Sequence, residues 1–139
     1  MDALLTGMYG EAIALTRLLS WGYPATLVPG PLTYDLVVDV DGLPYRIQVK
    51  ATNRECKHGD GENSFSFLIS CAGKKKRRCY NLGEYDILAC VSLYNNNILF
   101  LPFTDKIRIR RKVSTFTKEK ELASWEACLK YLSSTEKKN

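Results

Sequence analysis

The segment over residues 34–51 constrains the fold more than any other part of the chain, because it has the alternation of a β-hairpin. In residues 34–40 and again in residues 45–51, side chains alternate between an apolar and a more polar set, which is the period of a strand with one covered face. The dipeptide Asp41-Gly42 between them is a strong signal for a tight turn joining antiparallel strands. We therefore predict an antiparallel hairpin with one apolar and one polar face.

The turn length decides which residues of this hairpin lie opposite one another. A two-residue turn pairs Asp35 with Gln48, whereas a four-residue loop pairs Asp35 with Lys50. Either register gathers Asp35, Gln48 and Lys50 on the polar face. A carboxylate, an amide and an ammonium grouped in this way fit a site for a cation and water. A solvent-facing salt bridge on an amphipathic hairpin would produce the same pattern.

A helix is predicted over residues 3–20, where apolar residues recur at helical spacing and Gly22 follows as a stop signal. The apolar stripe comprises Leu4, Leu5, Met8, Ala12, Leu15, Leu18 and Leu19. Glu11 lies within or beside this stripe when the residues are placed 100° apart. Its carboxylate either reaches past the stripe to water or belongs to a site shared with the hairpin.

The remaining segments predict further strands and a second helix in a mixed α/β domain. Strands are expected over residues 25–28, 64–70, 87–93, 98–101 and 106–113. A polar loop is expected over residues 52–63, and a helix over residues 118–132. We predict one domain over residues 1–132 and a flexible tail over residues 133–139.

Composition excludes several classes of protein. With 45% hydrophobic and 25% charged residues, the chain is neither a disordered acidic protein nor a collagen-like repeat. No apolar run approaches the roughly 18 residues of a membrane helix, so we expect a cytoplasmic protein with no membrane partner. The five cysteines are scattered and lack paired Cys-x-x-Cys spacing, which favours reduced thiols over a zinc site.

Charge is distributed unevenly along the chain. The formal net charge of +5 combines a net −2 in residues 1–50 with a net +7 in the remaining 89. Half of the 20 basic residues lie in two short runs, at positions 74–78 and 106–112. The side chains that we expect to face a polyanion are Lys74, Lys75, Lys76, Arg77, Arg78, Lys106, Arg108, Arg110 and Lys112. A solvated loop and a charged edge strand would give the same composition.

The ordered set of Glu11 on a helix, Tyr34-Asp35 on a strand and Gln48-Val49-Lys50 on its hairpin partner resembles the core of PD-(D/E)XK nucleases. The resemblance is clearest over residues 7–52. Within that superfamily the chain is most similar to small homing endonucleases associated with group I introns of cyanobacteria and their phages. Archaeal Holliday-junction resolvases are a second similar branch. The fold that this resemblance implies is a restriction-endonuclease-like α/β core, with a mixed central sheet flanked by helices.

The resemblance also implies roles for individual residues. Glu11, Asp35 and the backbone carbonyl of Val49 would bind Mg²⁺, and Lys50 would hold or help deprotonate the attacking water. Gln48 stands where an acidic ligand is usual and would orient water or bind the metal weakly. This departure leaves open whether one or two metal ions bind, and it favours the homing-endonuclease branch, in which glutamine is tolerated here.

The expected function is therefore sequence-specific, Mg²⁺-dependent cleavage of both strands of duplex DNA, in a bacterial or phage-infected cell. The alternatives are a structure-specific junction resolvase and a DNA-binding module whose nuclease site has decayed. A double-strand break requires two active sites, so we expect a homo-oligomer, either a dimer or a tetramer. The contact surfaces expected for it are the helix over residues 118–132, with Trp125, Cys128, Leu129 and Tyr131, and the hairpin over residues 87–101.

Overall fold

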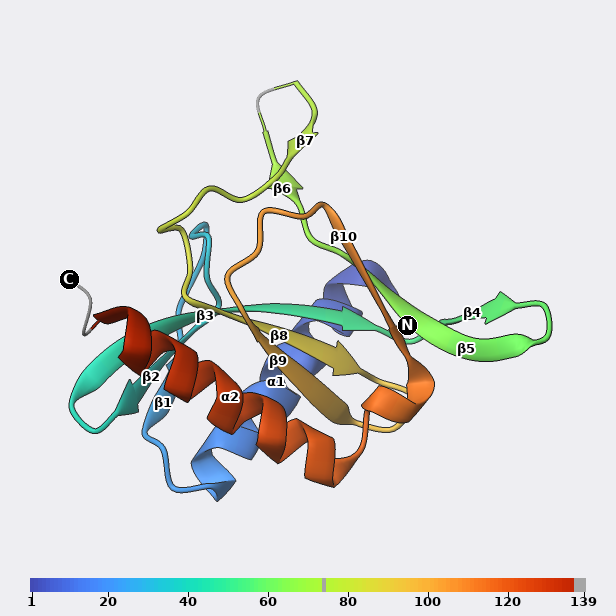
Figure 1. Ribbon diagram of the computed structural model, residues 1–139. Coiled ribbons are helices and arrows are strands. Elements are labelled where there is room, and N and C mark those ends of the chain that lie inside the picture. Colours follow the sequence, from blue (N-terminus) through green and yellow to red (C-terminus); the bar gives the residue numbers. More distant parts are fainter. Residues whose placement is uncertain (74, 137–139) are drawn as a thin grey trace.

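The computed structural model describes residues 1–73 and 75–136, which form three layers (Figure 1). The helices are α1 (Ala3–Ser20) and α2 (Lys118–Glu136). The central sheet has the order β1 (Ala25–Leu27), β2 (Leu36–Val40), β3 (Leu43–Thr52), β8 (Ile87–Ser92) and β9 (Asn97–Pro102). The second sheet has the order β10 (Arg108–Lys112), β5 (Gly61–Leu68) and β4 (Glu55–His58). A short 3-10 helix (Val113–Thr115) follows β10, and β6 (Cys71–Ala72) and β7 (Arg77–Arg78) form a separate hairpin.

The central sheet is mixed, which confirms the predicted α/β class. Its strands β3 and β8 pair in parallel, whereas its other neighbouring strands pair antiparallel. A parallel pair cannot be joined by a tight turn. The chain therefore leaves the central sheet after β3, forms β4 to β7, and returns as β8.

The hairpin of β2 and β3 has the register of the two-residue turn. The paired positions run from Val40 with Leu43 to Leu36 with Ile47, as a two-residue turn requires, and Asp35 directly precedes the last pair. Asp41 and Gly42 have φ values of 53° and 88°, as a tight turn between twisted strands requires. The alternative four-residue loop is therefore wrong.

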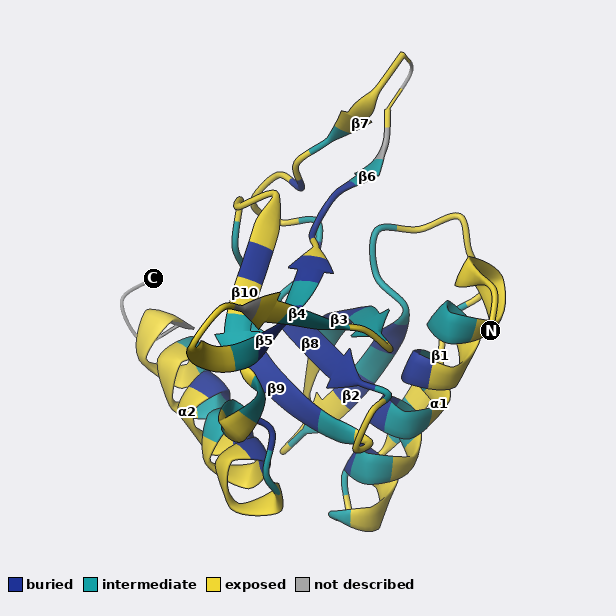
Figure 2. Cartoon of the chain, turned by 90° about the vertical axis from the view of Figure 1, so that its right-hand side faces the viewer, coloured by how far each residue is buried: buried dark blue, intermediate teal, exposed yellow. Residues whose placement is uncertain are grey.

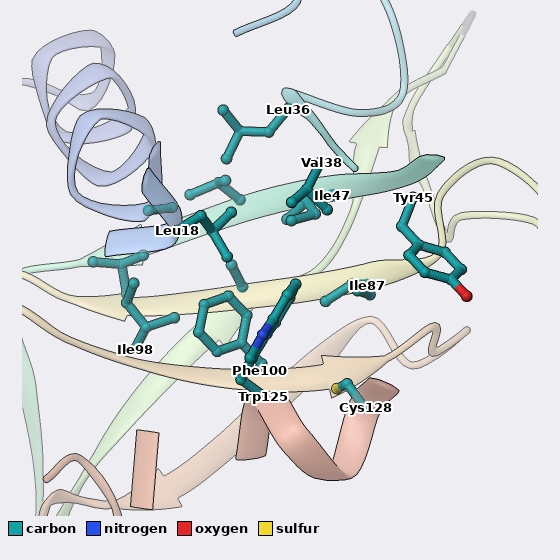
Figure 3. Packing of buried hydrophobic residues seen from close by; sticks show 14 residues of the cluster. Leu18, Leu36, Val38, Tyr45, Ile47, Ile87, Ile98, Phe100, Trp125 and Cys128 are labelled. Carbon is teal, nitrogen blue, oxygen red and sulfur yellow. The ribbon is translucent and has the colours of Figure 1, made fainter. Parts of the chain in front are cut away.

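Each face of the central sheet is covered by a different layer. Figure 3 shows the first face, where Leu18 of α1 and Trp125 of α2 pack against Ile47, Ile87 and Phe100. Both helices therefore cover the same face. On the opposite face, Leu88 and Leu99 belong to a cluster that includes Phe65, Phe67 and Ile109 of the second sheet. The polar residues of β3 lie on this second face, so the second sheet borders the candidate site.

The predicted apolar stripe of α1 coincides with its buried face only in part, through Leu18 and the half-buried Leu15. The fully buried positions are Gly10, Ala14 and Leu18, whereas the side chains of Leu4 and Met8 are 72% and 56% exposed. The small residues let the helix approach the sheet closely. Hydrophobicity alone does not reveal this face because two of its three residues have little side chain to bury.

Two predicted boundaries also differ from the structure. Residues 52–63 are not one long loop, because they contain β4 and the start of β5, paired as a hairpin. The helix α2 continues to Glu136, four residues beyond the predicted end. Residues 137–139 lie outside the described part of the chain. No helix among the described residues is long and apolar enough to span a membrane.

Two of the four residues named for the predicted oligomer surface on α2 are internal. Trp125 and Cys128 are at most 1% exposed and pack in the core against the central sheet, so that part of the prediction is wrong. Every residue of β8 is buried as well. Among the residues named for this surface, Tyr131 remains available, with 55% of its surface exposed.

Candidate active site

Glu11 is brought to the central sheet by the close approach of α1 to β3. A Cβ built on Gly10 would lie 2.6 Å from the Cβ of Ala51, so any larger residue would push the helix away from the strand. Glu11 follows this contact directly and is half-buried. The electrostatic influence of Asp35 on its carboxyl group indicates that these two acids are neighbours. The helix therefore supplies one of the two carboxylates of the site.

Asp35 is fixed by the backbone of β3 at the point where β2 begins. Its own N–H donates to the carbonyl of Ile47 over 2.8 Å, and its carboxylate oxygen Oδ2 accepts from the N–H of Val49 over 2.8 Å. The Asp35 side chain thus takes the place of a backbone carbonyl as the acceptor for the Val49 N–H. This hydrogen bond holds the carboxylate at the edge of β3.

The carbonyl of Val49 points to the same side as its N–H, because both groups of one strand residue point the same way. It therefore points past the start of β2, toward the side of Asp35. Gln48 lies beside them and is 5% exposed. Its amide nitrogen donates to the Thr33 carbonyl over 2.9 Å, which turns its amide oxygen away from Thr33. Carboxylate, backbone carbonyl and amide oxygen atoms, from Asp35, Val49 and Gln48, therefore lie together at this edge of β3.

Lys50 extends from the same polar face of β3 as Gln48. Its Nζ donates to the carbonyl of Ser70 over 3.1 Å and lies 5.4 Å from the centre of the Tyr80 ring. The tyrosine is 4% exposed and packs in the second apolar cluster. Lys50 is thus held by an apolar wall and one backbone oxygen, with its charge near Asp35.

Burial shifts the ionisation of all three groups. Desolvation raises the pKa of Glu11, and the charge of Asp35 adds to this effect. Desolvation also raises the pKa of Asp35, against the opposing effects of the Val49 N–H and of Lys50. The pKa of Lys50 is lowered, chiefly by burial, with Asp35 opposing and Arg77 reinforcing the shift. Such mutually dependent shifts are typical of sites that perform proton transfer or bind ions.

The donor set fits a magnesium ion that is only partly coordinated by protein. The described residues contain no group of three or more His, Cys, Asp or Glu side chains that could hold a metal by themselves. Mg²⁺ needs no such group, since it keeps several waters and commonly binds one or two carboxylates together with substrate phosphates. Glu11, Asp35 and the Val49 carbonyl provide hard oxygen ligands for this mode of binding.

The basic run at positions 74–78 divides into several environments. Lys75 and Lys76 are exposed near the tip of the β6–β7 hairpin, which projects from the body of the molecule (Figure 2). Arg77 is anchored to Ser70, whereas Arg78 pairs with Glu84 through two hydrogen bonds of 2.7 and 2.8 Å. Lys74 lies outside the described residues. The run is therefore not a uniform cationic surface.

The second basic run gives the second sheet a charged outer face. Arg108, Arg110 and Lys112 are exposed on β10, whereas Ile109 between them is buried against the core. Arg108 donates to the hydroxyl of Ser66 on β5 over 2.8 Å. Lys106 is exposed just before the strand. The predicted alternation of this strand is thus present, with Arg108, Arg110 and Lys112 on one face and Arg111 on the other.

Sequence reasoning does not single out Ser70, which is fully buried and joins β5 to β6. Its carbonyl accepts from Lys50, and both its carbonyl and its hydroxyl accept from Arg77. No local motif marks a serine for such a role, because its partners lie 20 and 7 residues away in the chain. Only the tertiary structure identifies it.

Comparisons with known proteins agree with this geometry. The family model described as PD-(D/E)XK endonuclease matches residues 1–127. The chain therefore belongs to the PD-(D/E)XK endonuclease family. It is similar in structure to a bacterial homing endonuclease, I-Ssp6803I, with a TM-score of 0.68 and 18% identity over 98% of this chain and 99% of that one. At this identity the likeness concerns the fold. A comparison with curated protein sequences gave no match.

Proposed function

We propose that this nuclease is a sequence-specific, Mg²⁺-dependent DNA endonuclease that cuts both strands of a duplex. The observation that supports it most is the convergence of Glu11, Asp35 and Lys50 from three separate segments, with Asp35 fixed by the Val49 N–H. Two acids beside one lysine are what phosphodiester hydrolysis needs, because the reaction requires charge neutralisation and an activated water. We further propose that it acts in the cytoplasm of a bacterial or phage-infected cell, in line with the bacterial homing endonuclease that it resembles in structure.

Each residue of the site has a distinct task in this proposal. Glu11, Asp35 and the Val49 carbonyl would hold Mg²⁺, which would supply charge neutralisation at the scissile phosphate and lower the pKa of bound water. Lys50 orients the attacking water and takes up or donates its proton, a role helped by the lowered pKa of its ammonium group. Gln48 orients water through its amide oxygen, since its nitrogen is engaged by Thr33.

Duplex DNA would be bound by the exposed cations on both sides of the site. On the β6–β7 hairpin these are Lys75 and Lys76, and on the second sheet they are Lys106, Arg108, Arg110 and Lys112. Phosphate contacts give affinity, whereas arginines entering the major groove can recognise guanine. We leave Arg78 out of this surface because Glu84 neutralises its charge.

A double-strand break also requires a second active site, and we therefore keep the homo-oligomer as part of the proposal. Light scattering without DNA should report at least twice the 15.8 kDa mass of one chain. A strict monomer, both free and on its target, would contradict double-strand cleavage and favour a nicking enzyme.

The central experiment finds the cut DNA sequence directly, with no target assumed in advance. Wild-type protein is incubated with genomic DNA in Mg²⁺ or in EDTA, and the new ends are sequenced. The proposal predicts recurrent ends at one sequence, in Mg²⁺ only. Ends without a common sequence would contradict specificity, and preferred cutting of branched over linear DNA would favour the resolvase alternative. Binding without any cutting would favour the decayed-site alternative.

A further inference from the structure

Arg77 lies closer to the active site than its position in an exposed hairpin indicates. Its Nε donates to the Ser70 hydroxyl over 2.7 Å, and its Nη2 donates to the Ser70 carbonyl over 2.8 Å. The Nζ of Lys50 donates to the same carbonyl over 3.1 Å. Because Lys50 Nζ and Arg77 Nη2 donate to the same oxygen atom, the distance between these two nitrogens is at most the sum of the two hydrogen-bond lengths.

Bringing two positive charges together costs free energy that an anion between them would recover. Arg78 provides the contrast, because its charge is matched by Glu84 within the same part of the fold. Arg77 instead binds only neutral oxygens of Ser70 through the two bonds given above. Its guanidinium has five N–H donors, so three of them remain for a ligand after these two bonds are made.

The surface in front of this pair is hollow. A cleft of about 540 Å³ is lined by Val49, Lys50 and Arg77 on one side, and by Arg54 and the first turns of α1 on another. The Val49 and Lys50 walls belong to the candidate active site. An extended anionic chain lying in this cleft would pass Lys50 and Arg77, together with Val49, the residue whose N–H holds the Asp35 carboxylate.

We propose that Arg77 contacts the scissile phosphate of DNA beside Lys50, and that Ser70 positions both cations for it. This inference rests on the proposed nuclease function and adds to it a second phosphate-binding cation from a different hairpin. An arginine suits the role because it forks onto two oxygens of one serine while presenting other donors to phosphate. The buried Ser70 then sets the spacing between the two cations.

The test compares Arg77→Met with Arg78→Met, which removes the same charge from the adjacent residue. We expect Arg77→Met to lower kcat for cleavage of the mapped site by about 100-fold. Ser70→Ala, which retains the carbonyl but loses the hydroxyl, should lower kcat by about 10-fold. Compared with Arg77→Met, Arg77→Lys should restore DNA affinity more than kcat. Lysine keeps the positive charge but cannot donate to both Ser70 oxygens and phosphate as the planar guanidinium can. Arg78→Met should cleave at close to the wild-type rate, and circular dichroism should show all four variants folded.

A second measurement separates this inference from the proposed function. Binding of a fluorescent duplex is measured in Ca²⁺ at several salt concentrations, whether or not the wild type cuts. Losing one phosphate contact should reduce the salt slope of binding by about one in Arg77→Met, and leave it unchanged in Arg78→Met. Equal slopes or equal kcat losses in the two variants would overturn the inference. If the wild type binds but does not cut, the proposed function fails while the slope still decides the role of Arg77.

Discussion

The β2–β3 and β6–β7 hairpins hold their functional side chains by different means. In the first, a continuous ladder sets the register, and a backbone N–H fixes the carboxylate of Asp35. In the second, only two residues pair on each strand, and Arg77 and Arg78 are held by individual side-chain anchors. Backbone hydrogen bonds between paired strands place an atom accurately, but moving that atom would disturb the neighbouring pairs. Where individual side-chain hydrogen bonds hold a residue, a substitution can alter one cation and leave the strands in place.

The largest effect on cleavage should come from replacing Asp35, the carboxylate that the backbone of β3 holds in place. Asp35→Ala should lower Mg²⁺-dependent cleavage by at least about 1000-fold, because it removes a metal ligand, and Lys50→Ala should do the same through the water. Metal-free DNA binding and the melting temperature should change little, since the apolar face stabilises the hairpin. Glu126→Ala, at an exposed position of α2, controls for the loss of one negative charge. Near wild-type cutting by either site variant would show that the site is misassigned.

A smaller loss is expected at the carboxylate that comes from the helix. Glu11→Gln should reduce cleavage by about 10- to 100-fold and raise the Mg²⁺ concentration needed for half the maximal rate. Glu126→Gln, an exposed position on α2, controls for the loss of one negative charge. An unchanged Mg²⁺ dependence would mean that the Glu11 side chain simply reaches to water.

The cations of the second sheet should affect binding and not chemistry. In the double variant Arg108→Met with Arg110→Met, the salt slope of DNA binding should fall by about two while kcat at saturating DNA is retained. Lys118→Met with Lys130→Met, which removes two charges from exposed positions of α2, serves as the control for net charge. A large fall in kcat with unchanged affinity would reverse the assignment of the two regions.

Replacing Gln48 tests whether its side chain, on the same strand as the Val49 N–H that holds Asp35, takes part in metal binding. Gln48→Glu adds a carboxylate but cannot donate to the Thr33 carbonyl, so it also loses a 2.9 Å hydrogen bond. We expect half-maximal activity at a lower Mg²⁺ concentration, with the maximal rate retained or reduced. Superimposable Mg²⁺ titrations of variant and wild type would place Gln48 outside the metal's ligands.

The smallest effect concerns stability without metal. Because burial raises the pKa of Asp35 in the folded protein, the folded state binds more protons than the unfolded state between the ordinary and the raised pKa. The free energy of unfolding should therefore fall as pH rises through that interval. Asp35→Asn removes this dependence and should melt at a higher temperature than wild type at pH 7 in EDTA. A lower melting temperature would show that the ionised carboxylate stabilises the fold.

The same contrast explains what the sequence could predict. The alternation of residues 34–51 and the Asp41-Gly42 turn predict the hairpin, but they leave two registers open, between which the pairing in the structure decides. The strand β4 escapes prediction because its segment is polar, and such edge strands are stabilised by contacts like that of Asn63 with Glu55. The anchor at Ser70 escapes it because it depends on residues that only the folded chain brings together.

The parallel pairing of β3 and β8 has a consequence for how such a protein can change over evolution. Residues 53–86 connect these strands, and they hold β4, β5 and the β6–β7 hairpin, with part of the surface proposed to bind DNA. Since a parallel pair needs a long connection in any case, that connection can lengthen, shorten or be exchanged without shifting either strand. Target preference and cutting chemistry can therefore diverge separately, although Ser70 and Arg77 mark the point where the exchangeable segment must still meet the fixed position of Lys50.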